Sequence, residues 1–208
     1  MQVTVYGASG KVGRLVVDEL LVGGHTVVAF VHNYNPFVSL GEVQVVSGSV
    51  DNPTLVAAAA AGSQVIISTL GSWGTPSKAV VSTGTGAIIA AAAKHKITRV
   101  ITLTGASALY VRDKPTLRDR LIHVLLNLAA AKILRDGEAH LRLLADSSLD
   151  WTSIRSPIML GFGSTLYGLQ RRLPSLLATI PRRAVVKALV DQLNDTSHLR
   201  QAPVIRRG

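Results

Sequence analysis

Short runs of β-branched and other apolar residues alternate with alanine- and leucine-rich segments along the first half of the chain. The run at 64–69 has almost no polar alternation, which is typical of a strand buried on both faces of a sheet. Because strands and helices alternate, the order predicts right-handed crossovers and a doubly wound parallel sheet with helices on both faces, an α/β fold. The expected strands are 2–6, 25–32, 43–47, 64–69 and 99–104, and the expected helices are 11–22, 54–61 and 78–95.

The second half of the chain is less regular. Residues 110–117 are charged and contain Pro115, so we expect a surface loop there. Residues 161–174 are glycine-rich and are expected to form a mobile loop over the sheet. The other expected elements are one long helix or a broken pair at 121–145, a strand at 151–155, a helix at 184–193 and a short strand at 203–205.

Composition narrows the class of protein. The chain has 208 residues, of which 48% are hydrophobic and 16% charged, so it can bury a sizeable core. The absence of cysteine excludes a disulfide scaffold, a thiolate metal site and a cysteine nucleophile. The first residues lack a basic and apolar leader, and no apolar run approaches the roughly 18 residues needed to span a bilayer. We therefore expect a cytoplasmic protein with no membrane partner.

The positive charge lies mostly in the second half. The net charge is +10, divided as +2 over residues 1–104 and +8 over residues 105–208. Such a basic surface suits nucleic acid, an acidic partner or an anionic ligand, or it is simply solvated. Sequence-specific nucleic-acid binding is not expected, because no helix-turn-helix pattern is present and aromatic residues make up only 4% of the chain.

A glycine-rich turn separates the first expected strand from the first expected helix. Three glycines spaced by three allow a tight turn, the approach of a pyrophosphate and close packing of helix on sheet. The N–H groups and dipole of the helix favour a phosphate at the same end. A tight turn alone also needs glycine, but the strand–loop–helix context predicts a dinucleotide-binding domain of the Rossmann type. The candidate phosphate-binding residues are Gly7, Ser9, Gly10, Lys11, Val12 and Gly13.

The end of the second expected strand bears on the choice of nucleotide. A carboxylate there would bind the adenosine ribose of NAD and repel a 2′-phosphate. This chain has His32 and Asn33 instead, with no acid before Glu42. His32, together with Lys11, can face a 2′-phosphate, although an exposed histidine at a strand end is an equal alternative. The pattern favours NADP(H) over NAD(H).

Several segments together resemble a known family. They are the loop 6–13, Thr69-Leu70-Gly71, the stretch 100–105, the element Leu-Asp-Trp-Thr-Ser-Ile-Arg-Ser-Pro at 149–157, and Ile180-Pro181-Arg182 with Val185. They look like atypical short-chain dehydrogenase/reductases, and most closely the NAD(P)H-binding group of biliverdin/flavin reductases and NmrA-like proteins. The likeness covers nearly the whole chain.

The resemblance implies positions for the whole nucleotide. The glycine loop would hold the pyrophosphate, His32 and Asn33 would lie by the adenosine ribose, and Thr69, Leu70 and Gly71 would flank the nicotinamide ribose. Ser156, Pro157 and Ile158 would pass near the nicotinamide. Flavin reductases of this kind carry a serine where this chain has Gly105, so Thr104 and Ser107 are the remaining candidate catalytic hydroxyls.

Two aromatic residues are candidates for the substrate side. Tyr110 and Lys114 have the Tyr-x-x-x-Lys spacing of ordinary short-chain dehydrogenases, but Pro115 disfavours the helix that such a pair needs. We therefore expect Tyr110 to be a lid residue. Trp73 either walls the substrate pocket or packs in the core. No pair of histidines has metal-ligand spacing with a nearby carboxylate, so no metal site is expected.

These observations predict one NAD(P)-binding domain over residues 1–208, with a cofactor-binding core at 1–155 and a small substrate-side segment at 156–208. The leading hypothesis is an oxidoreductase that transfers hydride from NADPH to a flavin, a quinone or a similar conjugated small molecule. The alternative is a non-catalytic, NmrA-like sensor that binds NADP(H). Either protein would be a monomer or a homodimer.

Overall fold

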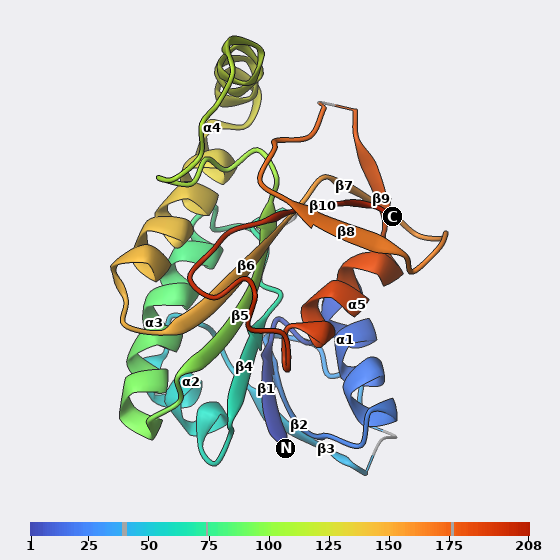
Figure 1. The fold of residues 1–208 in the computed structure, drawn as a ribbon. Coiled ribbons are helices and arrows are strands. Elements are labelled where there is room, and N and C mark those ends of the chain that lie inside the picture. Colours follow the sequence, from blue (N-terminus) through green and yellow to red (C-terminus); the bar gives the residue numbers. More distant parts are fainter. Residues whose placement is uncertain (39–40, 74, 176) are drawn as a thin grey trace.

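An eight-stranded sheet draws its strands from both halves of the chain (Figure 1). The computed structural model describes residues 1–38, 41–73, 75–175 and 177–208. Neighbouring strands are parallel except β8, which is antiparallel to β10. The sheet order is β3 (Val43–Ser47), β2 (Thr26–Val31), β1 (Gln2–Tyr6), β4 (Val65–Ser68), β5 (Arg99–Gly105), β6 (Asp150–Ser156), β10 (Val204–Arg207) and β8 (Tyr167–Gln170).

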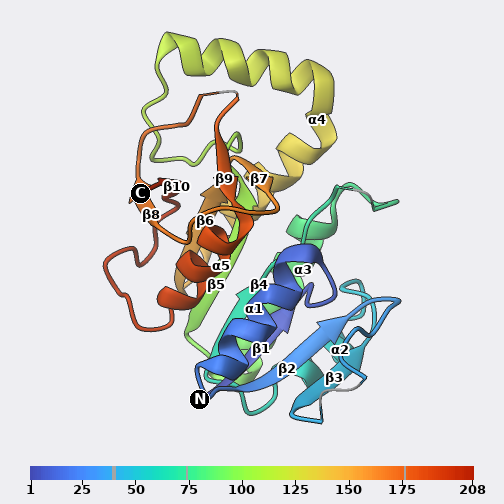
Figure 2. The ribbon, with the colours of Figure 1, turned by 90° about the vertical axis from the view of Figure 1, so that its right-hand side faces the viewer.

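Helices cover both faces of the sheet, as Figures 1 and 2 show. On one face lie α1 (Lys11–Val22) and α5 (Arg182–Asp191), and on the other lie α2 (Pro53–Ala60), α3 (Val80–His95) and α4 (Leu117–Asp146). A hydrophobic core lies on each face of the sheet, and alternate residues of β1 point into one or the other. Val3 and Val5 pack with α1, whereas Tyr6 packs with α2. The predicted doubly wound α/β fold is confirmed.

Local sequence explains where the helices begin. Asn52 caps α2, since its side-chain oxygen accepts hydrogen bonds from the N–H groups of Thr54 (3.1 Å) and Leu55 (3.2 Å), and Pro53 occupies the first helical position. A capping box between Thr116 and Asp119 starts α4. None of the helices in the described parts of the chain is long and apolar enough to cross a membrane.

Helix α4 is bent at Ala130, whose φ of −146° and ψ of 39° are not helical. This agrees with the expectation of one long helix or a broken pair. Its buried residues all follow the bend, among them Leu134, Leu141 and Leu144. The part before the bend projects beyond the carboxyl ends of the strands and runs across that end of the molecule (Figure 2).

The expected mobile loop at 161–174 is wrong for residues 167–170. They form β8, which pairs with β10 along its whole length, from Val204 opposite Gln170 to Arg207 opposite Tyr167. The pairing gives the edge of β10 a hydrogen-bonded partner. Two further short strands, β7 (Ile158–Leu160) and β9 (Thr179–Pro181), form a separate parallel pair that the sequence did not predict.

Tyr110 is buried and is not a lid residue. Its ring packs edge-on against Trp151, with 5.7 Å between the ring centroids. Arg155 of β6 holds this segment, since its guanidinium Nη2 donates to Asp113 Oδ1 at 2.7 Å and its Nη1 donates to the Ala108 carbonyl at 3.0 Å. The segment between β5 and α4 is therefore fixed to the core by a buried ion pair.

Candidate functional site

The loop between β1 and α1 is shaped by two of its glycines. Gly7 has a φ of +75°, which side-chain-bearing residues rarely adopt. A Cβ on Gly13 would lie 2.2 Å from the carbonyl oxygen of Gly7 and 2.7 Å from the Cα of Ala8. The first turn of α1 therefore touches the loop backbone itself, and only glycine allows this approach.

The N-terminus of α1 is suited to an anion. Gly10 is its N-cap, and no side chain caps the helix. The first N–H groups of a helix have no intrahelical partner and carry partial positive charge. With Lys11 exposed beside them, these groups fit the diphosphate of a dinucleotide.

A cavity of about 720 Å³ extends from this loop across the carboxyl ends of β4, β5 and β6. The inner side of α4 forms its opposite wall. The structure thus brings together most of the residues that the sequence singled out. Those that line the cavity are Gly10, Lys11, Val12, Thr69, Leu70, Gly71, Trp73, Thr104, Ser107, Ser156, Pro157 and Ile158.

The remaining candidates do not line the cavity. Gly7 and Ser9 belong to the loop before α1, and Gly13 is buried in the first turn of α1. His32 and Asn33 are exposed just after β2, at the same edge of the sheet as the glycine loop.

Thr69 joins the end of β4 to the glycine loop. Its hydroxyl donates to the carbonyl oxygens of Tyr6 and Gly7, both at 3.1 Å. Its N–H donates to the Tyr6 carbonyl at 2.9 Å. The side chain of Thr69 therefore joins the segment after β4 to the loop that precedes α1. Both segments line the same end of the cavity.

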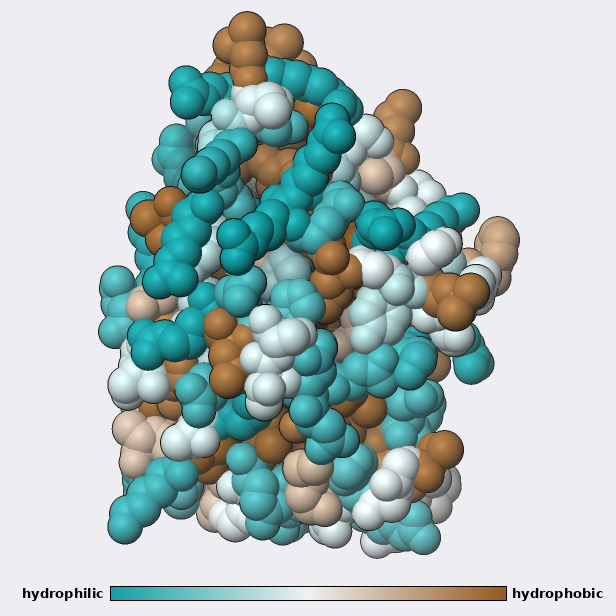
Figure 3. All heavy atoms as spheres, in the orientation of Figure 1, coloured by the Kyte–Doolittle hydropathy of each residue, from teal (hydrophilic) through white to brown (hydrophobic). Residues whose placement is uncertain are grey.

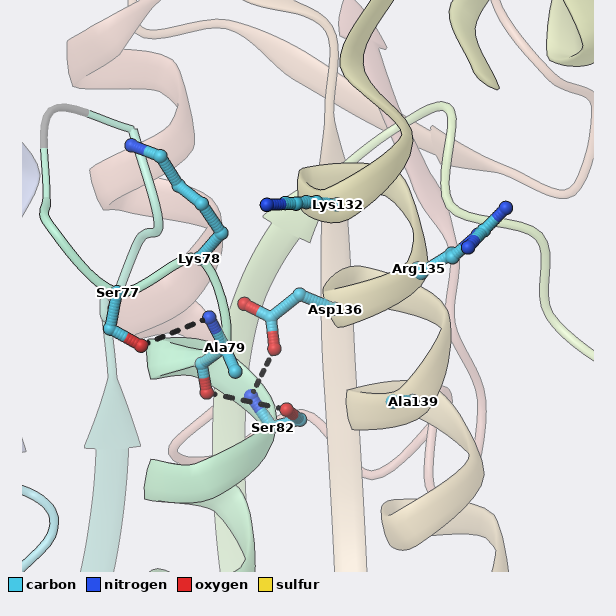
Figure 4. A pocket seen from close by; sticks show the side chains of 8 residues that line it. All are labelled: Ser77, Lys78, Ala79, Ser82, Lys132, Arg135, Asp136 and Ala139. Carbon is cyan, nitrogen blue, oxygen red and sulfur yellow. Dashed lines mark hydrogen bonds between the residues drawn. The ribbon is translucent and has the colours of Figure 1, made fainter. Parts of the chain in front are cut away.

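Asp136 of α4 fixes the segment after β4 to the start of α3. Its carboxylate accepts hydrogen bonds from the Ser72 hydroxyl and from the N–H groups of Val81 (3.1 Å) and Ser82 (2.8 Å). It thereby caps α3, whose own N-cap residue makes no side-chain hydrogen bond. Figure 4 shows this carboxylate pointing from α4 at the first turn of α3.

Basic side chains surround a smaller hollow of about 420 Å³ beside Asp136. Lys78 and Lys132 lie on its two sides, whereas Arg135 points away from them (Figure 4). The N–H groups of Val81 and Ser82 at the start of α3 already donate to the Asp136 carboxylate, so they are not free for an anion in this hollow.

Sequence reasoning missed two polar groups in the cavity wall. His123 and Asp119 of α4 both line the cavity. The His123 Nε2 lies 2.7 Å from the Glu138 carboxylate, which belongs to the part of α4 after the bend. Hydrogen bonds from the N–H and hydroxyl of Thr116 lower the pKa of Asp119. The detectable signal was the helical spacing of Asp119, His123 and Leu126 on one face of α4.

Arg14 was also missed. Its guanidinium carbon lies 5.6 Å from the centre of the Tyr34 ring, and its Nε donates to the Ser9 carbonyl at 2.9 Å. Tyr34 follows His32 by two residues, so Arg14 brings a permanent positive charge to the segment after β2. The signal was an arginine directly after the third glycine of the loop.

Across residues 1–38, 41–73, 75–175 and 177–208, no group of three or more histidine, cysteine, aspartate or glutamate side chains is arranged to hold an ion.

Comparisons with known proteins show the family and the fold. The NAD(P)H-binding family model matches residues 7–196, whereas no curated protein sequence matches the chain. A short-chain dehydrogenase/reductase from Veillonella parvula DSM 2008 in complex with NADP has a similar structure, with 19% identity and a TM-score of 0.80 over 99% of this chain and 94% of that one.

Two other solved structures are similar to a comparable degree. ChuY, an anaerobillin reductase from Escherichia coli O157:H7, is 21% identical, with a TM-score of 0.81 over 100% of this chain and 97% of that one. A protein from Streptococcus pneumoniae TIGR4, proposed to be an NADH-flavin reductase, is 19% identical, with a TM-score of 0.78 over 100% of both chains. At these identities the likeness shows a shared fold.

Proposed function

The chain belongs to the NAD(P)H-binding family, and from that premise we propose that it is an NADPH-dependent oxidoreductase acting on a flavin, a quinone or a similar conjugated molecule. One observation carries the proposal: the cavity that starts at the glycine loop continues to the inner side of α4. A nucleotide held at the loop would share this space with an acceptor. The similar folds of an NADP complex and of an anaerobillin reductase support the proposal.

The residues along the cavity suit the parts of such a nucleotide in order. The glycine loop and the start of α1 would hold the diphosphate, Thr69 and Gly71 the nicotinamide ribose, and Ser156-Pro157 the nicotinamide ring. A bound reduced nicotinamide supplies the hydride. Thr104 and Ser107 would offer hydroxyl groups to the acceptor.

His123 is the best-placed group to hold a proton for the acceptor. Its Nε2 faces Glu138, which leaves Nδ1 of the same ring for a molecule in the cavity. The carboxylate on the far side of the imidazole fixes the orientation of the ring. Solvent can also protonate a reduced flavin or quinone, so a variant at His123 should slow turnover without abolishing it.

Arg14 and His32 support a preference for NADP(H). Both are exposed, and Arg14 stacks on Tyr34 in the segment that follows His32. No carboxylate lies between the end of β2 and Glu42 to bind a ribose 2′-hydroxyl. A charged hydrogen bond to a phosphate contributes about 1.5–3 kcal/mol. Arg14→Gln should therefore weaken NADPH binding about tenfold or more and leave NADH binding nearly unchanged.

A nucleotide titration tests the central claim. We expect the unsubstituted protein to bind NADPH more tightly than NADH, and Gly10→Asp to bind neither, because its carboxylate would meet the diphosphate. Gly86→Asp is the matched control: Gly86 lies in α3, and a Cβ there meets nothing within 4 Å. If the unsubstituted protein binds neither nucleotide, the proposal fails. Tighter binding of NADH would refute the roles of Arg14 and His32.

The burial of Tyr110 favours one alternative, a non-catalytic sensor of NADP(H). With Tyr110 packed against Trp151, the Tyr-x-x-x-Lys spacing supplies no proton-transfer pair to the cavity. Following NADPH oxidation at 340 nm with menadione and with a flavin separates the two. Steady turnover supports the enzyme, whereas tight binding without turnover on either acceptor would favour the sensor.

A further inference from the structure

The projecting part of α4 carries a second apolar face, on the side away from the cavity. Leu117, Leu121, Val124, Leu125 and Leu128 are each more than half exposed, from 51% at Leu125 to 84% at Leu117. At 100° per residue they fall within a stripe roughly 100° wide. Figure 3 shows hydrophobic side chains gathered at this end of the molecule.

Positive charges border this stripe. Arg118 and Arg120 fall on its two sides by the same helical spacing, and Arg112 and Lys114 precede the helix; all four are exposed.

The two acids of the same segment do not border the stripe. Asp113 is buried in its ion pair with Arg155, and Asp119 bonds to Thr116 and lines the cavity. The charges that border the stripe are therefore cationic, as at the borders of helices that lie in a membrane interface.

We propose that this face of α4, residues 117–128, docks in the plane of an anionic lipid surface. The leucines would enter the boundary between headgroups and acyl chains, and the arginines would remain at the level of the lipid phosphates. The expectation of no membrane partner rested on the lack of a spanning segment, and an in-plane helix needs none. The inner side of the same helix lines the cavity, so a docked molecule would hold its cavity about one helix diameter, roughly 10 Å, from the lipid.

A second copy of the chain fits this face less well. The stripe is about 16 Å long and roughly 10 Å wide, far below the roughly 800 Å² per partner of a stable protein interface. Two such faces related by a two-fold axis would also bring the arginines of one copy close to those of the other. An anionic surface meets both the apolar and the cationic parts of the pattern.

Vesicle flotation with the full chain tests the proposal, using phosphatidylcholine vesicles with and without 30% phosphatidylglycerol. We expect binding to the anionic vesicles, little binding to the neutral ones, and release at high salt. Leu121→Gln with Leu128→Gln should weaken binding at least about tenfold, since two leucines would no longer enter the apolar layer. Arg118→Gln with Arg120→Gln should weaken it by a similar factor at low salt.

The control is Val22→Gln, which changes a side chain that is 88% exposed at the far end of α1 and should bind vesicles as the unsubstituted protein does. Circular dichroism and NADPH affinity show whether the leucine variant is folded. Equal vesicle binding by that variant and the unsubstituted protein would overturn the proposal. The proposal would also be overturned if the unsubstituted protein did not bind vesicles. In that case, a dimer in sedimentation that the leucine substitutions dissociate would show that the face binds a second copy of the chain instead. Vesicle binding is measured without nucleotide, so this result is separate from that of the nucleotide titration.

Discussion

The imidazole of His140 is enclosed between α3, α4 and the sheet by hydroxyl groups. Its Nδ1 lies 2.6 Å from the Thr85 hydroxyl, and its Nε2 lies 3.0 Å from that of Thr102 and 3.3 Å from that of Ser153. The side chain is 1% exposed. Burial lowers the pKa of His140 to about 4, and the nearby carboxylate of Asp136 opposes this shift only in part. The folded protein therefore holds His140 neutral.

Lowering the pH should destabilise the protein through this residue. The pKa in the fold, about 4, lies below the 6.5 of an unperturbed histidine, so the unfolded chain takes up the proton more readily. The contribution of His140 is intact above pH 6.5 and is lost as the pH falls from 6.5 to 4. At 1.36 kcal/mol per pKa unit, the loss is about 2 kcal/mol at pH 5 and about 3 kcal/mol below pH 4.

Urea unfolding at pH 7 and pH 5 measures this loss. The unsubstituted protein should lose about 2 kcal/mol more of its unfolding free energy between these pH values than His140→Gln does. His198→Gln, at a partly exposed position, is the control and should behave like the unsubstituted protein. Equal losses in the unsubstituted protein and His140→Gln would refute the reasoning.

Three further predictions concern the fold and the site. Asp113→Asn should lower the unfolding free energy by about 3–5 kcal/mol in a urea titration, because it leaves the buried guanidinium of Arg155 without its ion-pair partner. The control, Lys187→Gln, removes an exposed ion pair and should lower the unfolding free energy by less than about 1 kcal/mol. Gly13→Ala should abolish NADPH binding in a fluorescence titration, because its Cβ would lie 2.2 Å from the Gly7 carbonyl oxygen; retained affinity would show that the loop can move away. His123→Gln should lower kcat without abolishing it, since solvent can also supply the proton, and an unchanged kcat would exclude His123 as a proton donor.

The sequence predicted the parts of this protein that are determined locally. The apolar run at β4 fits a strand buried on both faces, and the glycines before α1 allow a tight turn that other residues cannot make. The sheet core and the glycine loop follow from these two local patterns. Strand β8 was missed because its short segment contains Gly168 and pairs with β10, 34 or more residues later in the chain. Tyr110 was misplaced for a similar reason: its partner, Trp151, belongs to a distant strand. The direction in which His123 points depends on the bend at Ala130, and no spacing rule predicts such a bend.

The bend in α4 divides the helix into two parts that should differ in their protection from hydrogen exchange. The whole of α4 lies within the described chain, and all of its buried residues belong to the part after the bend. The amides of that part should therefore exchange only when the whole domain opens. The part before the bend can open by itself at a much lower free energy. Substitutions in this wall of the cavity therefore bear little on the stability of the sheet, and the wall can diverge in sequence while the sheet and the glycine loop stay the same.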